Sequence, residues 1–168
     1  MPWKMLEALL DHLVGMGIQA ELANRGRAIG VKGQSIDLVH LAASAVGPGG
    51  HPLEWRAVFI VCIDHPGVWS AQILDAHTRD VKSRRFWGHV VGIEWVGGEL
   101  ADVLNGDRWL NQVLMEQGQT MVEIGYKGDD VEIVSPPFAS KSQITPVAHA
   151  FPAYNRIAKH VRLVAAQL

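Results

Sequence analysis

Apolar residues recur at helical spacing in three segments of the chain. The first segment lies near the N-terminus, where leucines three or four residues apart fall on one face of a helix. These leucines are Leu6, Leu9, Leu10 and Leu13. The glycines at Gly15 and Gly17 interrupt the pattern, so we expect an N-terminal amphipathic helix that ends near them.

Segments 98–117 and 152–168 carry the other two helical patterns. The middle segment is interrupted at 105–107, so we expect a kink or two short helices, with Asn105 or Asp107 as an N-cap. The C-terminal segment is continuous and predicts one amphipathic helix. Its apolar face carries Tyr154, Ile157, Val161 and Val164.

Alternating or continuous apolar runs predict strands in much of the remaining chain. The strand at 54–64 has the clearest signal, because its β-branched and aromatic run is typical of the middle of a sheet. The later part of 35–46 contains no glycine or proline and would also suit a helix. ANRG and KGDD are expected turns of two hairpins. The expected extended segments are 18–22, 27–31, 35–46, 54–64, 69–78, 86–96 and the hairpin 121–134.

Successive strands with short connections favour antiparallel pairing. The order of elements therefore predicts one α+β domain over residues 1–168. We expect a curved antiparallel meander sheet of about six to eight strands, with the N-terminal, middle and C-terminal helices packed on it. The concave side of such a sheet either fills with side chains or encloses a ligand. Segment 135–152 contains four prolines and is expected to be irregular.

Composition narrows the possible functions. The chain has 168 residues, of which 48% are hydrophobic and 19% charged, enough apolar material for a sizeable core. A formal net charge of -2 argues against a general affinity for nucleic acid or anionic membranes. The N-terminal segment does not have the pattern of a signal peptide, and no run approaches the roughly 18 apolar residues of a membrane span. We therefore expect a soluble, cytoplasmic protein.

Motifs that would define a reaction are absent from the sequence. Dinucleotide-binding, phosphate-loop, zinc-protease and serine-hydrolase signatures do not occur. The single cysteine, Cys62, lies in the apolar run VFIVCI and is expected to be a buried, inert thiol. A cysteine nucleophile is the alternative, and it would need an electropositive, partly exposed environment.

The stretch ILDAHTRDVKSRRFWGHVV, residues 73–91, is the strongest candidate for a site. If the two flanking strands pair around Lys82, Asp75 lies opposite His89, and His77 lies beside them on the same face. Two histidines and a carboxylate form a common ligand set for a divalent metal, and a carboxylate can also orient an imidazole base. The simpler alternative is that this end of the hairpin is solvated.

The same register gathers three tryptophans, Trp69, Trp87 and Trp95, on one apolar face. Tryptophan fills cores, but it is also frequent in ligand cavities and interfaces. Our leading hypothesis is therefore a non-catalytic module that binds a small apolar or aromatic ligand, or a protein partner, in an aromatic-lined concavity. The alternative is a metal-dependent enzyme that uses Asp75, His77 and His89.

The tip of the hairpin mixes basic and aromatic residues, as in proteins that bind single-stranded nucleic acid. The basic residues are Arg79, Lys82, Arg84 and Arg85. Nucleic-acid contact through this tip is a second alternative, weakened by Asp80, and a solvated hairpin tip is the simpler explanation. A homodimer is expected only because two-fold assemblies are common.

Overall fold

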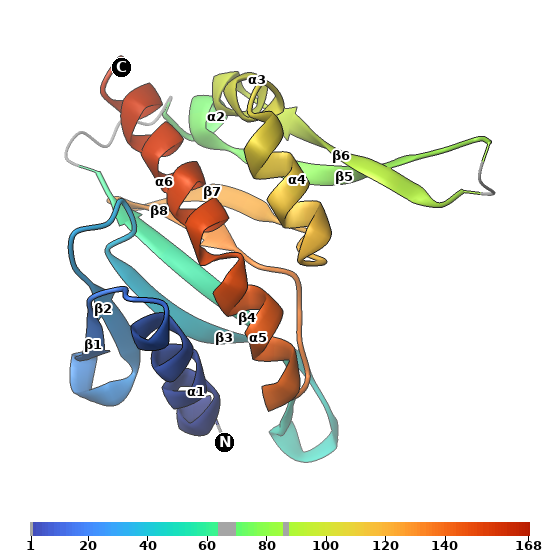
Figure 1. The fold of residues 1–168 in the computed structure, drawn as a ribbon. Coiled ribbons are helices and arrows are strands. Elements are labelled where there is room, and N and C mark those ends of the chain that lie inside the picture. Colours follow the sequence, from blue (N-terminus) through green and yellow to red (C-terminus); the bar gives the residue numbers. More distant parts are fainter. Residues whose placement is uncertain (1, 64–69, 86–87) are drawn as a thin grey trace.

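The computed structural model describes residues 2–63, 70–85 and 88–168. Within these ranges, eight strands form one antiparallel sheet in the order β1-β2-β3-β4-β8-β7-β5-β6 (Figure 1). The strands are β1 (Ala20–Ala23), β2 (Ala28–Val31), β3 (Leu38–Val46), β4 (Pro52–Cys62), β5 (Ala76–Lys82), β6 (Val90–Gly97), β7 (Glu123–Lys127) and β8 (Asp130–Val134). The sheet begins and ends on different strands and is not closed, which confirms the predicted α+β class.

The described residues also form six α-helices, which pack mainly against one face of this sheet (Figure 1). They are α1 (Pro2–Gly15), α2 (Ser70–Leu74), α3 (Glu99–Asn105), α4 (Arg108–Glu116), α5 (Ile144–His149) and α6 (Phe151–Ala165). Short 3-10 turns connect other elements: η1 (Asn24–Gly26), η2 (Pro48–Gly50) and η3 (Lys141–Gln143). Among the described residues, we find no helix with the length and apolarity needed to cross a membrane.

The centre of the core lies where α6 crosses β4. The rings of Tyr154 and Phe59 stack with centroids 4.2 Å apart and an interplanar angle of 17°. The Tyr154 hydroxyl donates to Gln119 Oε1 at 2.5 Å, so the buried phenol has a partner. Burial raises the pKa of Tyr154 well above its ordinary value, and the phenol stays neutral at physiological pH. The α6 helix thus anchors the middle of the sheet through an aromatic pair and one satisfied polar group.

Most of the predicted elements are confirmed. Residues 98–117 form two helices, as the interruption predicted, and Asp107 caps α4 by accepting from Leu110 N–H at 3.2 Å. The same carboxylate accepts from Arg156 Nε at 2.6 Å and from His160 Nε2 at 2.8 Å, which joins α4 to α6. Burial alone would raise the pKa of Asp107, but these hydrogen bonds lower it overall.

The strand predicted over 69–78 is wrong in its first half, where Ser70–Leu74 forms α2. The Asp75 N–H donates to Ala71 O at 2.9 Å, the hydrogen bond of a helical turn. This turn packs tightly against Gly98, where a Cβ atom would lie 2.0 Å from Gln72 O. A helical turn fits because Ile73 and Leu74 enter the hydrophobic core, while Ala, Gln and Leu are good helix formers.

The predicted register of the β5–β6 hairpin is also wrong. Observed partners include His77 with Val96 and Thr78 with Trp95, whereas pairing around Lys82 would place Trp95 opposite Trp69. The connection lies further along the chain, where Ser83 N–H donates to His89 O at 3.0 Å. Gly88 has φ +78 there and donates to Ser83 O, so this glycine marks the turn better than Lys82 does. The hairpin projects from the body as an arm (Figure 1).

Candidate functional site

The corrected register separates the three residues of the predicted metal site. His77 lies at the base of the hairpin arm, paired with Val96, and Asp75 immediately precedes β5. His89 lies near the tip, so about six residues of strand, roughly 20 Å, separate it from His77. Within the described ranges, no group of three or more His, Cys, Asp or Glu side chains could hold a metal ion. The structure therefore does not bring this ligand set together.

Of the three tryptophans predicted to line a concavity, only Trp95 lies within the described residues; Trp69 and Trp87 lie outside them. Trp95 is 2% exposed and belongs to the hydrophobic core. Its indole Nε1 donates to Asn111 Oδ1 at 2.8 Å, and its backbone N–H donates to Asn105 Oδ1 at 2.7 Å. Trp95 therefore ties β6 to α3 and α4 instead of facing a ligand.

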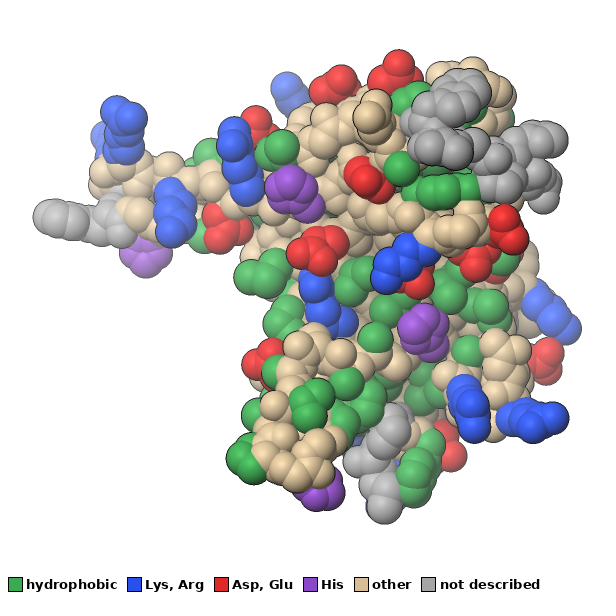
Figure 2. Space-filling view, turned by 180° about the vertical axis from the view of Figure 1, so that it is seen from behind, with side chains coloured by type: hydrophobic (Ala, Val, Ile, Leu, Met, Phe, Trp, Pro, Cys, Tyr) green, Lys and Arg blue, Asp and Glu red, His purple; other side chains and the backbone are tan. Residues whose placement is uncertain are grey.

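Asp75 and His77 do line a cavity of about 600 Å³ between β5, β7 and β8, on the face of the sheet opposite α6. We call it the charged groove (Figure 2 shows this face). It opens where β5 and β7 pair only at Ala76–Ile124 and His77–Glu123. Its other lining residues are Val96, Gly97, Gly125, Tyr126, Lys127, Glu132 and Val134.

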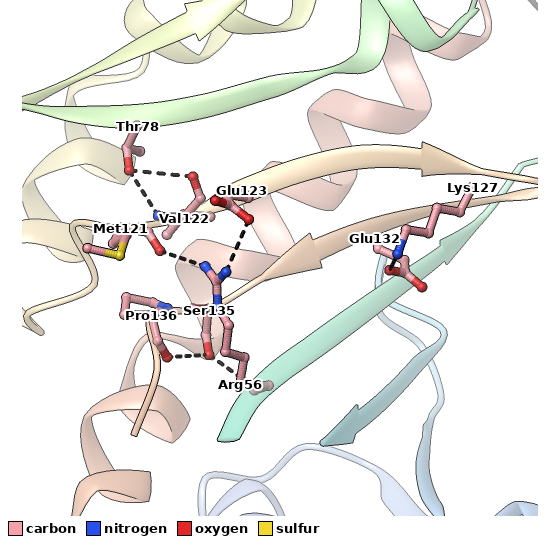
Figure 3. Close-up of polar contacts among 10 residues, drawn as sticks. Arg56, Thr78, Met121, Val122, Glu123, Lys127, Glu132, Ser135 and Pro136 are labelled. Atoms are coloured by element: carbon pink, nitrogen blue, oxygen red, sulfur yellow. Dashed lines mark hydrogen bonds and ion pairs between the residues drawn. The ribbon is translucent and has the colours of Figure 1, made fainter. Parts of the chain in front are cut away.

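Most charges in and around the charged groove already have partners within the protein (Figure 3). Arg56 reaches from β4 and donates to Ser135 O at 2.5 Å, to Glu123 Oε2 at 3.1 Å and to Met121 O at 3.3 Å. Lys127 and Glu132 form a second ion pair at 3.4 Å. These contacts join β4, β7 and β8, so the charges act chiefly as ties between strands.

Cys62 lies at the end of β4 and is exposed, which contradicts the prediction of a buried thiol. Its pKa is nevertheless raised to about 11 by partial burial and by the neighbouring carboxylates of Asp130 and Asp37. A thiol with this pKa is almost entirely protonated near neutral pH. The prediction of an inert thiol therefore agrees with its surroundings, in which partial burial raises the pKa most and the acidic neighbours raise it further.

A second cavity, of about 370 Å³, lies beneath the start of α1 on the helix-bearing face of the sheet. We call it the aromatic pocket. Four apolar side chains form its wall, from α1, β3 and β4: Trp3, Leu6, Leu41 and Trp55. Arg25, Gly26 and Arg27, from the turn between β1 and β2, complete the lining. The pocket thus combines an apolar wall with a cationic rim, an arrangement typical of small-ligand sites.

The turn that carries Arg25 has an unusual backbone. Asn24 and Arg25 have φ values of 51° and 60°, and Gly26 follows with φ +80. Residues other than glycine rarely adopt this left-handed backbone conformation, and such strain is concentrated at functional sites. Here the strained turn places an arginine at the rim of a cavity, where a glycine would be the more relaxed choice.

Arg25 and Arg27 are both exposed. Among the described residues, neither side chain forms an ion pair or a hydrogen bond to another side chain or to the backbone. Two guanidinium groups at the rim of a partly enclosed apolar cavity create a positive potential that favours an anion. The aromatic pocket therefore has cationic groups available to a ligand, unlike the paired charges of the charged groove.

The predicted basic tip is only partly described. Lys82, Arg84 and Arg85 are exposed near the end of the arm, while Arg79 pairs with Glu94 at 2.9 Å. Phe86 and Trp87, the aromatic part of the pattern, lie outside the described residues. Nucleic-acid contact at this tip stays a prediction.

No protein-family model, no curated protein and no solved structure matches this chain. Sequence reasoning missed the aromatic pocket because its components are far apart in the chain and carry only weak local signals. The one signal was the turn sequence ANRG, whose arginine precedes a glycine, together with a tryptophan, Trp55, at the start of the clearest strand.

Proposed function

We propose that this protein is a non-catalytic binding module whose ligand carries an apolar or aromatic group beside an anionic group. The aromatic pocket is the proposed site. The observation that carries the proposal is the position of Arg25 and Arg27, which have no side-chain partner among the described residues, on the rim of a cavity walled by Trp3 and Trp55.

Each part of the pocket has a distinct role in this proposal. The indole of Trp55 and the side chains of Leu6 and Leu41 would receive the apolar group, because removing that group from water is favourable. The guanidinium groups would bind the anion, since arginine recognises carboxylate, sulfonate or phosphate through directed, charge-assisted hydrogen bonds. The described lining contains no carboxylate, imidazole or thiol positioned to transfer a proton or attack a substrate. Binding without chemistry is therefore the role that this lining supports best.

A pair of fluorescent probes tests the proposal. Anilinonaphthalene sulfonate carries aromatic rings and an anion, whereas phenylnaphthylamine has similar rings and no charge. We expect the wild-type protein to bind the anionic probe more tightly. In the double variant Arg25→Gln/Arg27→Gln, affinity for the anionic probe should fall about tenfold, while affinity for the neutral probe should change less than about twofold.

The matched control removes two exposed arginines from the tip of the arm instead. Arg84→Gln/Arg85→Gln changes the net charge by the same amount, and it should leave both affinities within about twofold of wild type. Equal weakening by the two double variants would show that only the overall charge matters. That result, or probe binding that is insensitive to both double variants, would overturn the proposal.

A further inference from the structure

In the part of the chain that the structure describes, the edge of β3 beside the aromatic pocket has no partner strand. β2 pairs with β3 only at Ile29–Val39 and Gly30–Leu38, and the chain then turns away through Ala28 and Arg27 into η1. On its other side, β3 pairs with β4 as far as Val46. Within the described residues, the segment 41–46 therefore pairs with β4 on one side and with no strand on the other. We call this open side, which runs from the end of β2 to the turn before β4, the gap.

The direction of the hydrogen bonds along β3 shows which groups are open. Trp55, the β4 partner of Ala43, exchanges both of its backbone hydrogen bonds with Phe138 at 2.8 Å, on the side of β4 away from β3, so Ala43 points its N–H and C=O away from β4 and toward the β2 side. In an antiparallel ladder this direction alternates along the strand. The backbone groups of Leu41 and Val39, two and four residues before Ala43, therefore also point toward the β2 side. Of these three residues, only Val39 has a partner on β2, so Leu41 and Ala43 present N–H and C=O groups to the gap.

Cavities flank this gap on both faces of the sheet. The aromatic pocket lies on the helix-bearing face, and a second cavity of about 670 Å³ is lined on the opposite face by Ala28, Leu38, His40 and Ile60. Both cavities share Arg25, Arg27 and Leu41. A small molecule would need only one of them, whereas successive side chains of an extended peptide point to opposite faces and would enter both.

The composition of the edge agrees with an added strand. Residues 41–46 read LAASAV, with no charged residue and no proline, although exposed edges usually carry such protection. A register shift between Ala43 and Ala45 interrupts the ladder with β4, so the regular part of the open edge is short. The neighbouring arginines are complementary to an acidic side chain or a terminal carboxylate.

Resting on the proposed function of the aromatic pocket, we propose that its ligand is an extended acidic peptide that adds as a strand to the β3 edge. Main-chain hydrogen bonds to Leu41 and Ala43 would supply affinity, and an aromatic or large apolar side chain in the aromatic pocket would supply specificity. The next side chain along would enter the opposite cavity near His40.

The test uses an array of short peptides with aromatic and acidic residues at varied spacing, probed with the full chain. The tightest sequence is then titrated in solution by fluorescence anisotropy. A second version of that peptide is methylated at every other backbone nitrogen, which removes hydrogen bonds along one edge and keeps every side chain. We expect methylation on the pairing edge to weaken binding at least tenfold, and methylation on the other edge to weaken it less than about threefold.

The matching change in the protein is Ala43→Pro. Proline removes the outward N–H, and it is tolerated on an edge strand at a position whose N–H faces away from the ladder. We expect peptide affinity to fall at least about tenfold, while anilinonaphthalene sulfonate still binds within about twofold of wild type. If this variant does not fold, as judged by circular dichroism, the comparison of the methylated peptides still decides the question.

The outcomes separate the two proposals. Probe binding that depends on Arg25 and Arg27, with no peptide bound or with peptide binding unaffected by edge methylation, overturns the peptide and leaves the pocket's function standing. Probe binding that is insensitive to the arginines overturns the proposed function itself. Sedimentation of the wild type as a dimer and of Ala43→Pro as a monomer would assign the edge to a second copy of the chain, and would also overturn the peptide.

Discussion

The charged groove has an arginine beside it and the aromatic pocket has two on its rim, but these arginines differ in whether the protein already supplies their hydrogen-bond partners. Beside the charged groove, the Arg56 side chain is 17% exposed and donates to two backbone carbonyls and to Glu123, which lines the groove. In the aromatic pocket, the exposed side chains of Arg25 and Arg27 have no such partners among the described residues. A cavity lined by charges is therefore not by itself evidence of a ligand site, because the charges can serve to join strands.

Removing the Arg56 contacts beside the charged groove should have the largest effect on stability. Arg56→Met keeps the aliphatic length and removes all the donors, which leaves Ser135 O and Met121 O without this partner. We expect the free energy of unfolding to fall by about 2–3 kcal/mol, because hydrogen bonds from a charged donor to partly buried acceptors are lost. Urea denaturation measures this change. Affinity for anilinonaphthalene sulfonate should stay within about twofold, and a large loss would show that the two regions are coupled.

Asp107 is a second charged residue whose partners lie within the protein, because its carboxylate joins α4 to α6. Its contribution to stability should depend on pH. Its pKa is lowered in the folded protein, so the stability it contributes is fully present above its unfolded pKa of about 4. That contribution is lost as the pH falls through the folded-state pKa. We expect Asp107→Asn to lower the free energy of unfolding by about 1–2 kcal/mol at pH 7. The difference from wild type should narrow as the pH is lowered below about 4 in urea titrations; a constant difference would contradict the assignment.

The wall of the aromatic pocket should contribute a smaller effect, on binding alone. Trp3 and Trp109 are similarly exposed, at 50% and 46%, but only Trp3 lines the pocket. We expect Trp3→Ala to weaken both the anionic and the neutral probe about threefold to fivefold, because it removes apolar contact area and no charge. Trp109→Ala is the matched control and should change neither affinity. Equal loss of affinity in the two variants would show that the probes do not bind in the aromatic pocket.

The strained turn provides the smallest and most specific prediction. Arg25→Gly relaxes a residue at φ 60 but removes one cation from the rim. The free energy of unfolding should stay the same or rise by less than about 1 kcal/mol, since relief of strain is offset by the greater chain entropy of glycine in the unfolded state. Affinity for the anionic probe should fall about threefold or more in the same variant. A clear loss of stability would show that the Arg25 side chain holds the turn together.

Much of the fold could be predicted because its signals are local. The apolar repeat of α6, the interruption at Asp107 and the KGDD turn each depend on a few adjacent residues, and all three are confirmed. The β5–β6 register could not be predicted, because a shift of the turn from Lys82 to the residues around Gly88 moves every partner. That error alone created the predicted cluster of Asp75, His77 and His89.

The candidate site shows where local reasoning stops. By itself, the sequence determined the α+β class, most of the strands and the absence of a recognisable catalytic motif, since these follow from residue type and short-range spacing. Only the tertiary structure decided that Trp3, Arg25 and Trp55 line one cavity, and that Trp95 belongs to the core. The physical reason is that α1, η1 and β4 meet through sheet order and helix packing, which depend on contacts between residues far apart in the chain.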